Sequence, residues 1–380
     1  MDGVERYLEL ALRLARHEPD LVDSYHGPPE IARRVETEPL REPSELAVEA
    51  AVLLAELRGE RWLAAQVRAL ETTARILADE RLPYAEEVEL TYGIRPGWHD
   101  EDDFRRAHEL LDDALAGNGD LTARYAAWLD EVALPAETVE PAVRKTIALV
   151  RERASETVGL PEGEEVEVEI VSGKRWFGFA HYLGGFRTRI LVNVDLPFPA
   201  SELLWFCAHE AYPGHHTHRA WQEAELVRRG RVEAAMDVLW SPEAVLAEGI
   251  AETGPELVLD ADAHEVLAER LRSLGFEYDA EVGARVSAAR RLLFPVASNV
   301  ALLLHDRGAT REEAREYAAR WSLQPPARVE KMLANVEARE SPGYVHTYRE
   351  GRRLCHRFVD SDPERFRRLL TSQLLPEDLE

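Results

Sequence analysis

The stretch that decides this fold is His209-Glu210-Ala211-Tyr212-Pro213-Gly214-His215-His216, which holds three imidazoles and one carboxylate. On a straight α-helix, positions six apart are separated by roughly 240° and about 9 Å of rise, so His209 and His215 could not bind the same metal ion. Positions seven apart face the same way but stand about two turns apart. A continuous straight helix therefore predicts no common site for these side chains.

Pro213 gives a physical reason for the helix to be interrupted. A proline inside a helix clashes with the carbonyl four residues back, here that of His209, and lacks the N–H that would bond it. Gly214 beside it loosens the backbone, and wide-turn bulges are frequent at functional sites. A bulge that takes up two extra residues would bring His215 to the second histidine position of the zinc pattern H-E-x-x-H. We therefore expect a metal-binding helix, the alternative being a kinked helix end with solvated histidines.

The composition excludes some classes of partner. The chain has 380 residues and is 45% hydrophobic, which is enough for two or three globular domains. Its 46 basic residues against 71 acidic ones give a net charge of −25. This balance argues against nucleic acid and anionic membrane surfaces as partners, because both bind basic patches. The two cysteines, Cys207 and Cys355, are too few for a disulfide framework.

The first residues and the apolar runs of the sequence are the features that predict where the protein is located in the cell. The first six residues are acidic and lack a charged segment followed by an apolar one, so we expect no signal peptide. The apolar run 294–304 is shorter than the roughly 18 residues that a membrane span needs. We therefore predict a cytoplasmic protein with no membrane partner. Nothing in the sequence indicates an oligomeric state.

The hydrophobic pattern predicts two regions in a mainly α fold with a small β-sheet (α+β). Residues 1–158 carry helical stripes separated by Gly and Pro, and form a helical N-terminal region without a catalytic pattern. Residues 159–380 are expected to form the metal-binding region, with a sheet within 165–195 followed by helices. An alternating segment opens that sheet, and Gly184-Gly185 indicates a hairpin. An extended peptide could add to this sheet as an edge strand, or the strands could only pack beneath the metal helix.

A second helix offers the missing carboxylate. Ser241-Pro242-Glu243 combines an N-cap residue, a proline at the first helical position and an acid in the first turn. Glu248 and Glu252 lie four residues apart and so share one helix face, within an otherwise apolar segment. Buried carboxylates must be paired or bind a metal. Glu248 or Glu252 is therefore the natural third ligand, unless this face is solvated.

Three motifs together resemble a large bacterial family of proteins of unknown function, grouped with gluzincin-like zincin metallopeptidases and marked by HE-x-x-PGHH. They are His209-Glu210-x-x-Pro213-Gly214-His215-His216, Glu248-Gly249-x-Ala251 and Pro342-Gly343-x4-Tyr348-x2-Gly351. The resemblance covers roughly residues 160 to 360 and implies a zincin-like metallopeptidase architecture. The chain departs from the family at Ile250-Ala251-Glu252-Thr253 and at Ala301, where the family has Trp-Ala-Leu-Tyr and an Asp. The resemblance therefore carries over the metal shell but not the substrate pocket.

Two further resemblances choose among the candidate ligands. Glu248-Gly249-Ile250-Ala251 is similar to the Glu-Gly-x-Ala segment of zinc aminopeptidases, which implies Glu248 as the ligand and places Glu252 behind it. The Gly-His pair after a lengthened HE motif resembles the H-E-x-x-x-H site of dipeptidyl peptidases. This similarity favours His215 over His216.

We therefore predict a zinc-dependent hydrolase, first of all a metallopeptidase, that acts on a peptide or small amide. His209, His215 and Glu248 would hold Zn²⁺ with one position open for water, and Glu210 would be the general base. Tyr348 is the first candidate for the oxyanion donor and His305 the second, while His216 donates to substrate or orients a ligand. The alternatives are an amidase or esterase for a non-peptide substrate, and a non-catalytic helical scaffold with a structural metal site.

Overall fold

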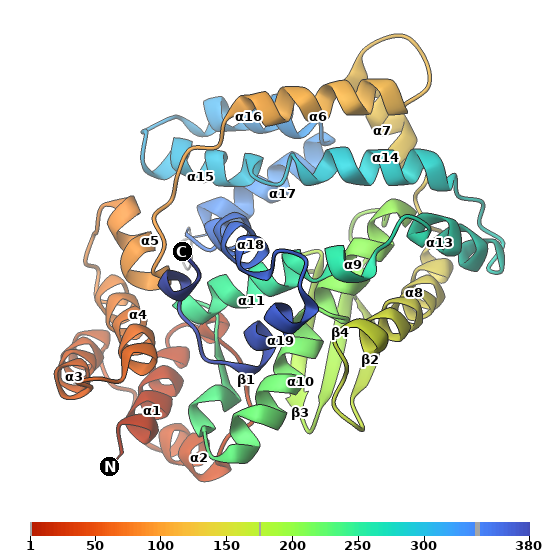
Figure 1. The fold of residues 1–380 in the computed structure, drawn as a ribbon. Coiled ribbons are helices and arrows are strands. Elements are labelled where there is room, and N and C mark those ends of the chain that lie inside the picture. The colour runs from red at the N-terminus through yellow and green to blue at the C-terminus, as the bar shows by residue number, and fades with distance from the viewer. Residues whose placement is uncertain (1, 175, 339–342) are drawn as a thin grey trace.

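A computed structural model describes residues 2–174, 176–338 and 343–380 (Figure 1). The chain is mostly helical with two small sheets, which confirms the expected mainly α fold with a small β component. Pro342, the first residue of the third sequence motif, lies outside the described residues. The buried apolar side chains form one contiguous core that includes both Tyr7 and Leu379. The division at residues 158 and 159 stays a prediction.

The first part of the chain is helical, as its apolar stripes predict. Its helices are α1 (Gly3–Ala15), α2 (Pro29–Thr37), α3 (Pro43–Glu56), α4 (Arg61–Leu77), α5 (Tyr84–Tyr92), α6 (Glu101–Ala114), α7 (Leu121–Glu131) and α8 (Ala136–Thr157), with a 3-10 turn, η1 (Pro19–Leu21). The short strand β1 (Val22–Tyr25) was not predicted. It pairs antiparallel with β5 (Met236–Val238), which directly precedes the segment leading into the Glu248 helix. The N-terminal part is thus tied by backbone hydrogen bonds to the region that carries the motifs.

The predicted three-stranded sheet is present. Its strands β2 (Glu165–Val171), β3 (Gly178–Gly184) and β4 (Arg187–Asn193) lie in the order β2-β4-β3, with β2 parallel and β3 antiparallel to β4. The β3–β4 connection is a tight hairpin, as Gly184-Gly185 predicts. Figure 1 shows the sheet beside α8, α9 and α10. One face of the sheet is therefore covered by the helices that carry the first motif.

The rest of the chain returns to helices. They are α9 (Leu203–Glu210), α10 (His215–Glu225), α11 (Pro242–Thr253), α12 (Pro255–Val258), α13 (Ala263–Arg272), α14 (Ala280–Arg291), α15 (Val296–His305), α16 (Arg311–Ser322), α17 (Pro326–Glu337), α18 (Val345–Val359) and α19 (Pro363–Thr371), with 3-10 turns η2 (Ala200–Glu202), η3 (Val227–Arg229), η4 (Val232–Ala235) and η5 (Pro376–Leu379). Most of these agree with the sequence pattern. Helix α18 was missed, because its segment reads as an aromatic cluster after Pro342-Gly343. It crosses α11 near the centre of the molecule (Figure 1).

The crossing of α11 and α18 depends on two glycines. A Cβ on Gly249 would lie 2.4 Å from the carbonyl oxygen of Gly351, and a Cβ on Gly351 would lie 2.2 Å from that of Val245. The two backbones therefore touch with no side chain between them. This close approach brings the first turns of α18 against the middle of α11, where Glu248 lies.

One helical stretch, 280–305, is by length and composition alone able to cross a membrane, with a mean hydropathy of 1.2. It extends beyond the run 294–304 that the sequence singled out. In the structure it consists of α14 and α15, separated by a turn, and half of its most apolar part is buried. The core helix of a globular protein passes the same test, so this finding is weak evidence for a membrane span.

We predict that Gly351→Ala lowers the free energy of unfolding by about 1–3 kcal/mol or more, because the added methyl would force the two backbones apart. Chemical denaturation gives the value. Gly97→Ala is the matched control, since a Cβ there meets only the Arg349 guanidinium, at 3.8 Å. Equal destabilisation by both substitutions would show that the helix crossing is not the cause.

Candidate metal centre

The sequence predicted one bulged helix for the motif residues, and this prediction is wrong. Helix α9 ends at Glu210, and a new helix, α10, begins at His215. The Tyr212–Pro213 peptide bond between them is cis, and the Gly214 N–H donates to the carbonyl of Ala208 at 2.9 Å. The two helices are separate because the chain turns back on the end of α9 instead of continuing along its axis. A Cβ on Gly214 would lie 1.8 Å from the His209 carbonyl oxygen, so only glycine fits here.

This turn brings the two predicted histidine ligands together, although they are six residues apart. The ring centroids of His209 and His215 are 4.8 Å apart, and the rings are nearly perpendicular. Glu248 comes from α11, and candidate ligand atoms of the three residues all lie within 4.8 Å of one another. The Oε2 atom of Glu248 is 3.4 Å from His209 Nε2 and 3.7 Å from His215 Nε2. Atoms bound to one zinc at about 2.0–2.2 Å in tetrahedral geometry are separated by roughly 3.3–3.6 Å. The two separations from Glu248 are close to this range and the third lies within 4.8 Å, so small side-chain shifts would bring all three groups onto one ion.

The Glu248 carboxylate is the group that points most specifically to a cation-binding site. Glu248 is buried, and its Oε1 accepts a hydrogen bond from the Tyr344 hydroxyl at 2.5 Å. Its Oε2 is buried without a hydrogen-bond partner among the described residues and lies on the side of the two imidazoles. A buried carboxylate oxygen without a partner is costly. A metal bound between the histidines would satisfy this atom.

The carboxylates of Glu210, Glu248 and Glu252 differ from the other buried carboxylates in their ion-pair partners. Among the described residues, each of the others forms an ion pair with arginine, namely Glu9, Glu164, Glu223, Glu233, Asp237, Glu243 and Glu350. Glu210, Glu248 and Glu252 have no such pair in that part of the chain. Among the described residues, the basic groups that pair directly with these acids are imidazoles and not arginines, which favours an added cation.

Glu252 lies behind His209, as the aminopeptidase resemblance implies. Its Oε1 is 3.1 Å from His209 Nδ1, on the side of the ring opposite to the nitrogen that faces Glu248. Burial alone would lower the pKa of His209, but Glu248 and Glu252 outweigh it and raise that pKa well above its ordinary value. A carboxylate that holds the second nitrogen of a ligand histidine fixes the orientation and tautomer of the ring.

Glu210 is buried and His215 is partly buried, and their pKa values shift in opposite directions. Burial lowers the pKa of His215 to about 3, so the ring stays neutral, which is the form that binds metals. Burial also raises the pKa of Glu210 to about 7; the positive field of His209 opposes this rise, and the neighbouring Glu248 carboxylate adds to it. A carboxyl group with such a pKa both accepts and returns a proton near neutral pH.

His216, which the sequence left open as a ligand, is turned away from the cluster. Its ring is fully buried, with Nδ1 2.7 Å from the Thr188 hydroxyl on β4 and Nε2 2.9 Å from a carboxylate oxygen of Glu164. Glu164 also accepts a hydrogen bond from the Tyr212 hydroxyl and pairs with Arg151 at 2.6 Å. His216 therefore fastens α10 to the sheet, and the second histidine of the cluster is His215.

The two oxyanion candidates lie in different places. The Tyr348 ring stacks on that of His209, with centroids 6.2 Å apart, and its side chain is 37% exposed. Desolvation and the carboxylates of Glu248 and Glu210 raise the pKa of Tyr348 well above its ordinary value, so its hydroxyl keeps its proton. His305, in contrast, is not brought to the cluster. Its contacts in the described part of the chain are with the Val336 carbonyl, 2.6 Å from Nε2, and the Tyr84 ring.

Tyr344 was not singled out from the sequence. It lies four residues before Tyr348, and the centroids of the two rings are 5.7 Å apart. This spacing would have indicated one helix face if the helical start of α18 had been recognised. Glu164 was missed for another reason, since nothing local in the sequence connects it with His216.

We predict that His215→Ala and His216→Ala have opposite consequences. His215→Ala should lower zinc affinity by more than the roughly 10–100-fold typical of changes behind a ligand. His216→Ala should retain zinc but lose about 1–3 kcal/mol of stability, because Glu164 and Thr188 would be left unpaired. Competition titration with a chelating dye and thermal unfolding measure the two effects. Loss of zinc from the folded His216→Ala variant alone would contradict the assignment.

Comparisons with known proteins give the fold and no function. No described protein family and no curated protein matches this chain. A solved structure described as "the putative lipoprotein from Colwellia psychrerythraea" is similar, with 17% identity, a TM-score of 0.57 and 92% of this chain covered. Another, described as "a putative lipoprotein of unknown function from Shewanella oneidensis", has 14% identity, a TM-score of 0.50 and 87% coverage. The match spans 64% and 63% of those chains, so this chain shares its fold with somewhat less than two thirds of each.

Proposed function

We propose that this protein is a zinc-dependent hydrolase, and specifically a metallopeptidase. The observation that carries the proposal is the group formed by His209, His215 and Glu248, in which the buried Oε2 of Glu248 lacks a hydrogen-bond partner among the described residues and faces both imidazoles. Two imidazoles and one carboxylate are the ligand set of many catalytic zinc sites.

The protein's own groups are suited to move a proton beside this site. Zinc, when bound, supplies a Lewis acid and lowers the pKa of water. Glu210 directly follows His209 at the end of α9, is buried, and has no ion pair with arginine in the described part of the chain. Its carboxylate would accept a proton from the attacking water and return it to the leaving amine. Burial of this carboxylate supports its use as a base, since desolvation raises its affinity for a proton.

The two tyrosines of α18 have separate roles in this proposal. Tyr344 donates to Glu248 and so holds the carboxylate in place. Tyr348 stacks beside His209 and is partly exposed, so its hydroxyl is placed to donate to the oxyanion of a bound substrate. The exposure of Tyr348 also marks the side from which substrate would enter.

The ligand count favours a catalytic site over a structural one. Structural zinc sites are commonly closed by four protein ligands, whereas the group found among the described residues contains three. A structural site would also not need a buried carboxylate directly after one of its ligands. The proposed substrate is a peptide or small amide, and the net charge of −25 argues against a nucleic-acid partner.

We predict that Glu210→Gln retains zinc but lowers turnover by about 10²–10⁴-fold, because the amide cannot accept the proton from water. The measurement is a chelator-sensitive digest of a peptide library, with bound zinc determined by elemental analysis. Glu265→Gln, at an exposed position on α13, is the control and should leave both unchanged. A zinc-loaded wild-type protein that cleaves no peptide but hydrolyses a non-peptide amide or ester would move the proposal to that class. Wild-type protein that binds no zinc would reject it altogether.

We also predict that Tyr348→Phe and Tyr344→Phe separate the two tyrosine roles. Tyr348→Phe should lower kcat by about 10²–10³-fold with zinc affinity unchanged. Tyr344→Phe should weaken zinc binding by about 10–100-fold, because Glu248 loses the donor that orients it. Each variant controls for the loss of a hydroxyl at the other. Equal effects of the two variants on zinc affinity would contradict this division.

A further inference from the structure

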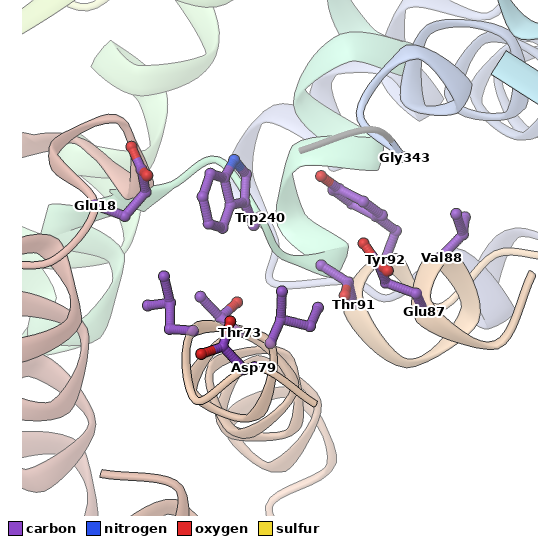
Figure 2. A pocket seen from close by; sticks show the side chains of 11 residues that line it. Glu18, Thr73, Asp79, Glu87, Val88, Thr91, Tyr92, Trp240 and Gly343 are labelled. Carbon is purple, nitrogen blue, oxygen red and sulfur yellow. The ribbon is translucent and has the colours of Figure 1, made fainter. Parts of the chain in front are cut away.

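A separate cavity of about 250 Å³ lies between α4, α5 and the segments that lead into α11 and α18 (Figure 2). It is lined by Glu18, Thr73, Ile76, Leu77, Asp79, Glu87, Val88, Thr91, Tyr92, Trp240 and Gly343. None of the three candidate zinc ligands contributes to it. It borders the metal centre through Gly343, which precedes Tyr344, and through the Tyr92 ring, whose centroid is 6.4 Å from that of Tyr344.

The walls of this cavity combine aromatic rings with carboxylates. Figure 2 shows Trp240 and Tyr92 on opposite sides of the space, with Thr73 and Asp79 on a third side. Aliphatic side chains complete the surface, and three carboxylates, those of Glu18, Asp79 and Glu87, lie around it. No Lys, Arg or His belongs to the described lining. The cavity therefore combines aromatic and aliphatic walls with acidic side chains, of which Glu87 has no ion pair among the described residues.

Glu87 is the lining carboxylate whose surroundings most favour a bound cation. It lies on α5, is half-buried, and forms no ion pair among the described residues. Burial raises its pKa above the ordinary value, and no basic group opposes this rise. In Figure 2 its carboxylate is turned toward the space between Tyr92 and Thr91. A positively charged group in the cavity would compensate this carboxylate, which the protein itself leaves without a cation.

We propose that this cavity binds a small organic cation, an ammonium group that carries short apolar substituents. The electron-rich faces of Trp and Tyr attract such cations, and a desolvated site strengthens the attraction. The Glu87 carboxylate disfavours anions, and the aromatic and aliphatic part of the wall favours an alkylated ammonium over a strongly hydrated metal ion. The volume admits a ligand of only a few heavy atoms or the basic end of a longer one.

The site is distinct from the proposed catalytic centre but touches the two segments that build it. Trp240 immediately precedes the Ser241-Pro242 start of α11, and Gly343 immediately precedes Tyr344, the donor to Glu248. The proposal concerns binding in the cavity and does not depend on zinc or on hydrolysis. It can therefore be tested whether or not the metal centre proves to be catalytic.

Ligand-observed NMR titration of the full-length protein tests the proposal. The probes are choline and n-butylamine, with 3,3-dimethyl-1-butanol and n-butanol as their uncharged counterparts and butyrate as an anion. We expect at least one of the two cations to bind about tenfold or more tightly than its uncharged counterpart, and butyrate not to compete. Failure of both cations to bind, or equal binding of the charged and uncharged members of each pair, would overturn the proposal.

Variants locate the binding. Glu87→Gln should weaken binding of the cation about tenfold, whereas Glu86→Gln, an exposed neighbour on the same helix, should leave it unchanged. Trp240→Leu should weaken binding through loss of the aromatic face. Trp240 is buried, so if the Trp240→Leu variant unfolds, the comparison of Glu87→Gln with Glu86→Gln decides the location of the ligand. Equal weakening by Glu86→Gln and Glu87→Gln would show only general attraction to an acidic surface and would place the ligand elsewhere.

Discussion

The candidate site depends first on a steric constraint in the backbone, the contact between Gly214 and the carbonyl of His209. No side chain fits there, since a Cβ would come within 1.8 Å of that oxygen. The chain can therefore fold back against the end of α9 and start α10 at His215. Because of this return, two imidazoles six residues apart face each other at 4.8 Å. Their approach is a property of the turn and not of any helical repeat.

A second close backbone contact brings in the rest of the site. Gly249 follows Glu248 directly, and its contact with Gly351 allows α18 to lie against α11. This packing places Tyr344 on the Glu248 carboxylate and Tyr348 beside His209. The metal ligands and their supporting groups thus come from three separate segments that meet only where glycines let backbones touch. Such sites are sensitive to small shifts, because a ligand moved by about 1 Å no longer fits the ion.

The sequence predicted most helices and the three-stranded sheet, because their apolar periodicities are local. It also predicted His209, His215 and Glu248 as one group, with the choice of His215 and Glu248 taken from a resemblance, and the structure brings these three together. It erred where the answer depends on contacts distant in sequence. His305 ends an apolar helix and looked available, but α17 supplies a carbonyl that engages its ring. His216 could be assigned only after Glu164, 52 residues away, was seen to bind it. The pairing of β1 with β5 had no local signal at all.

Buried charge provides an argument that does not depend on any motif. The chain has 46 basic residues, and in the part that the structure describes arginine pairs with the other buried carboxylates, as in Arg219–Glu243 and Arg151–Glu164. The three buried acids of the cluster are left without arginine among the described residues. Burying several carboxylates together is unfavourable unless positive charge offsets them, and here the described residues supply only imidazoles as direct partners, so a bound cation would stabilise the cluster. The two imidazoles turned toward Glu248 limit that cation to one that accepts nitrogen and oxygen ligands, as zinc does. The pattern of missing arginines therefore leads to the same site as the sequence motif, by an independent physical route.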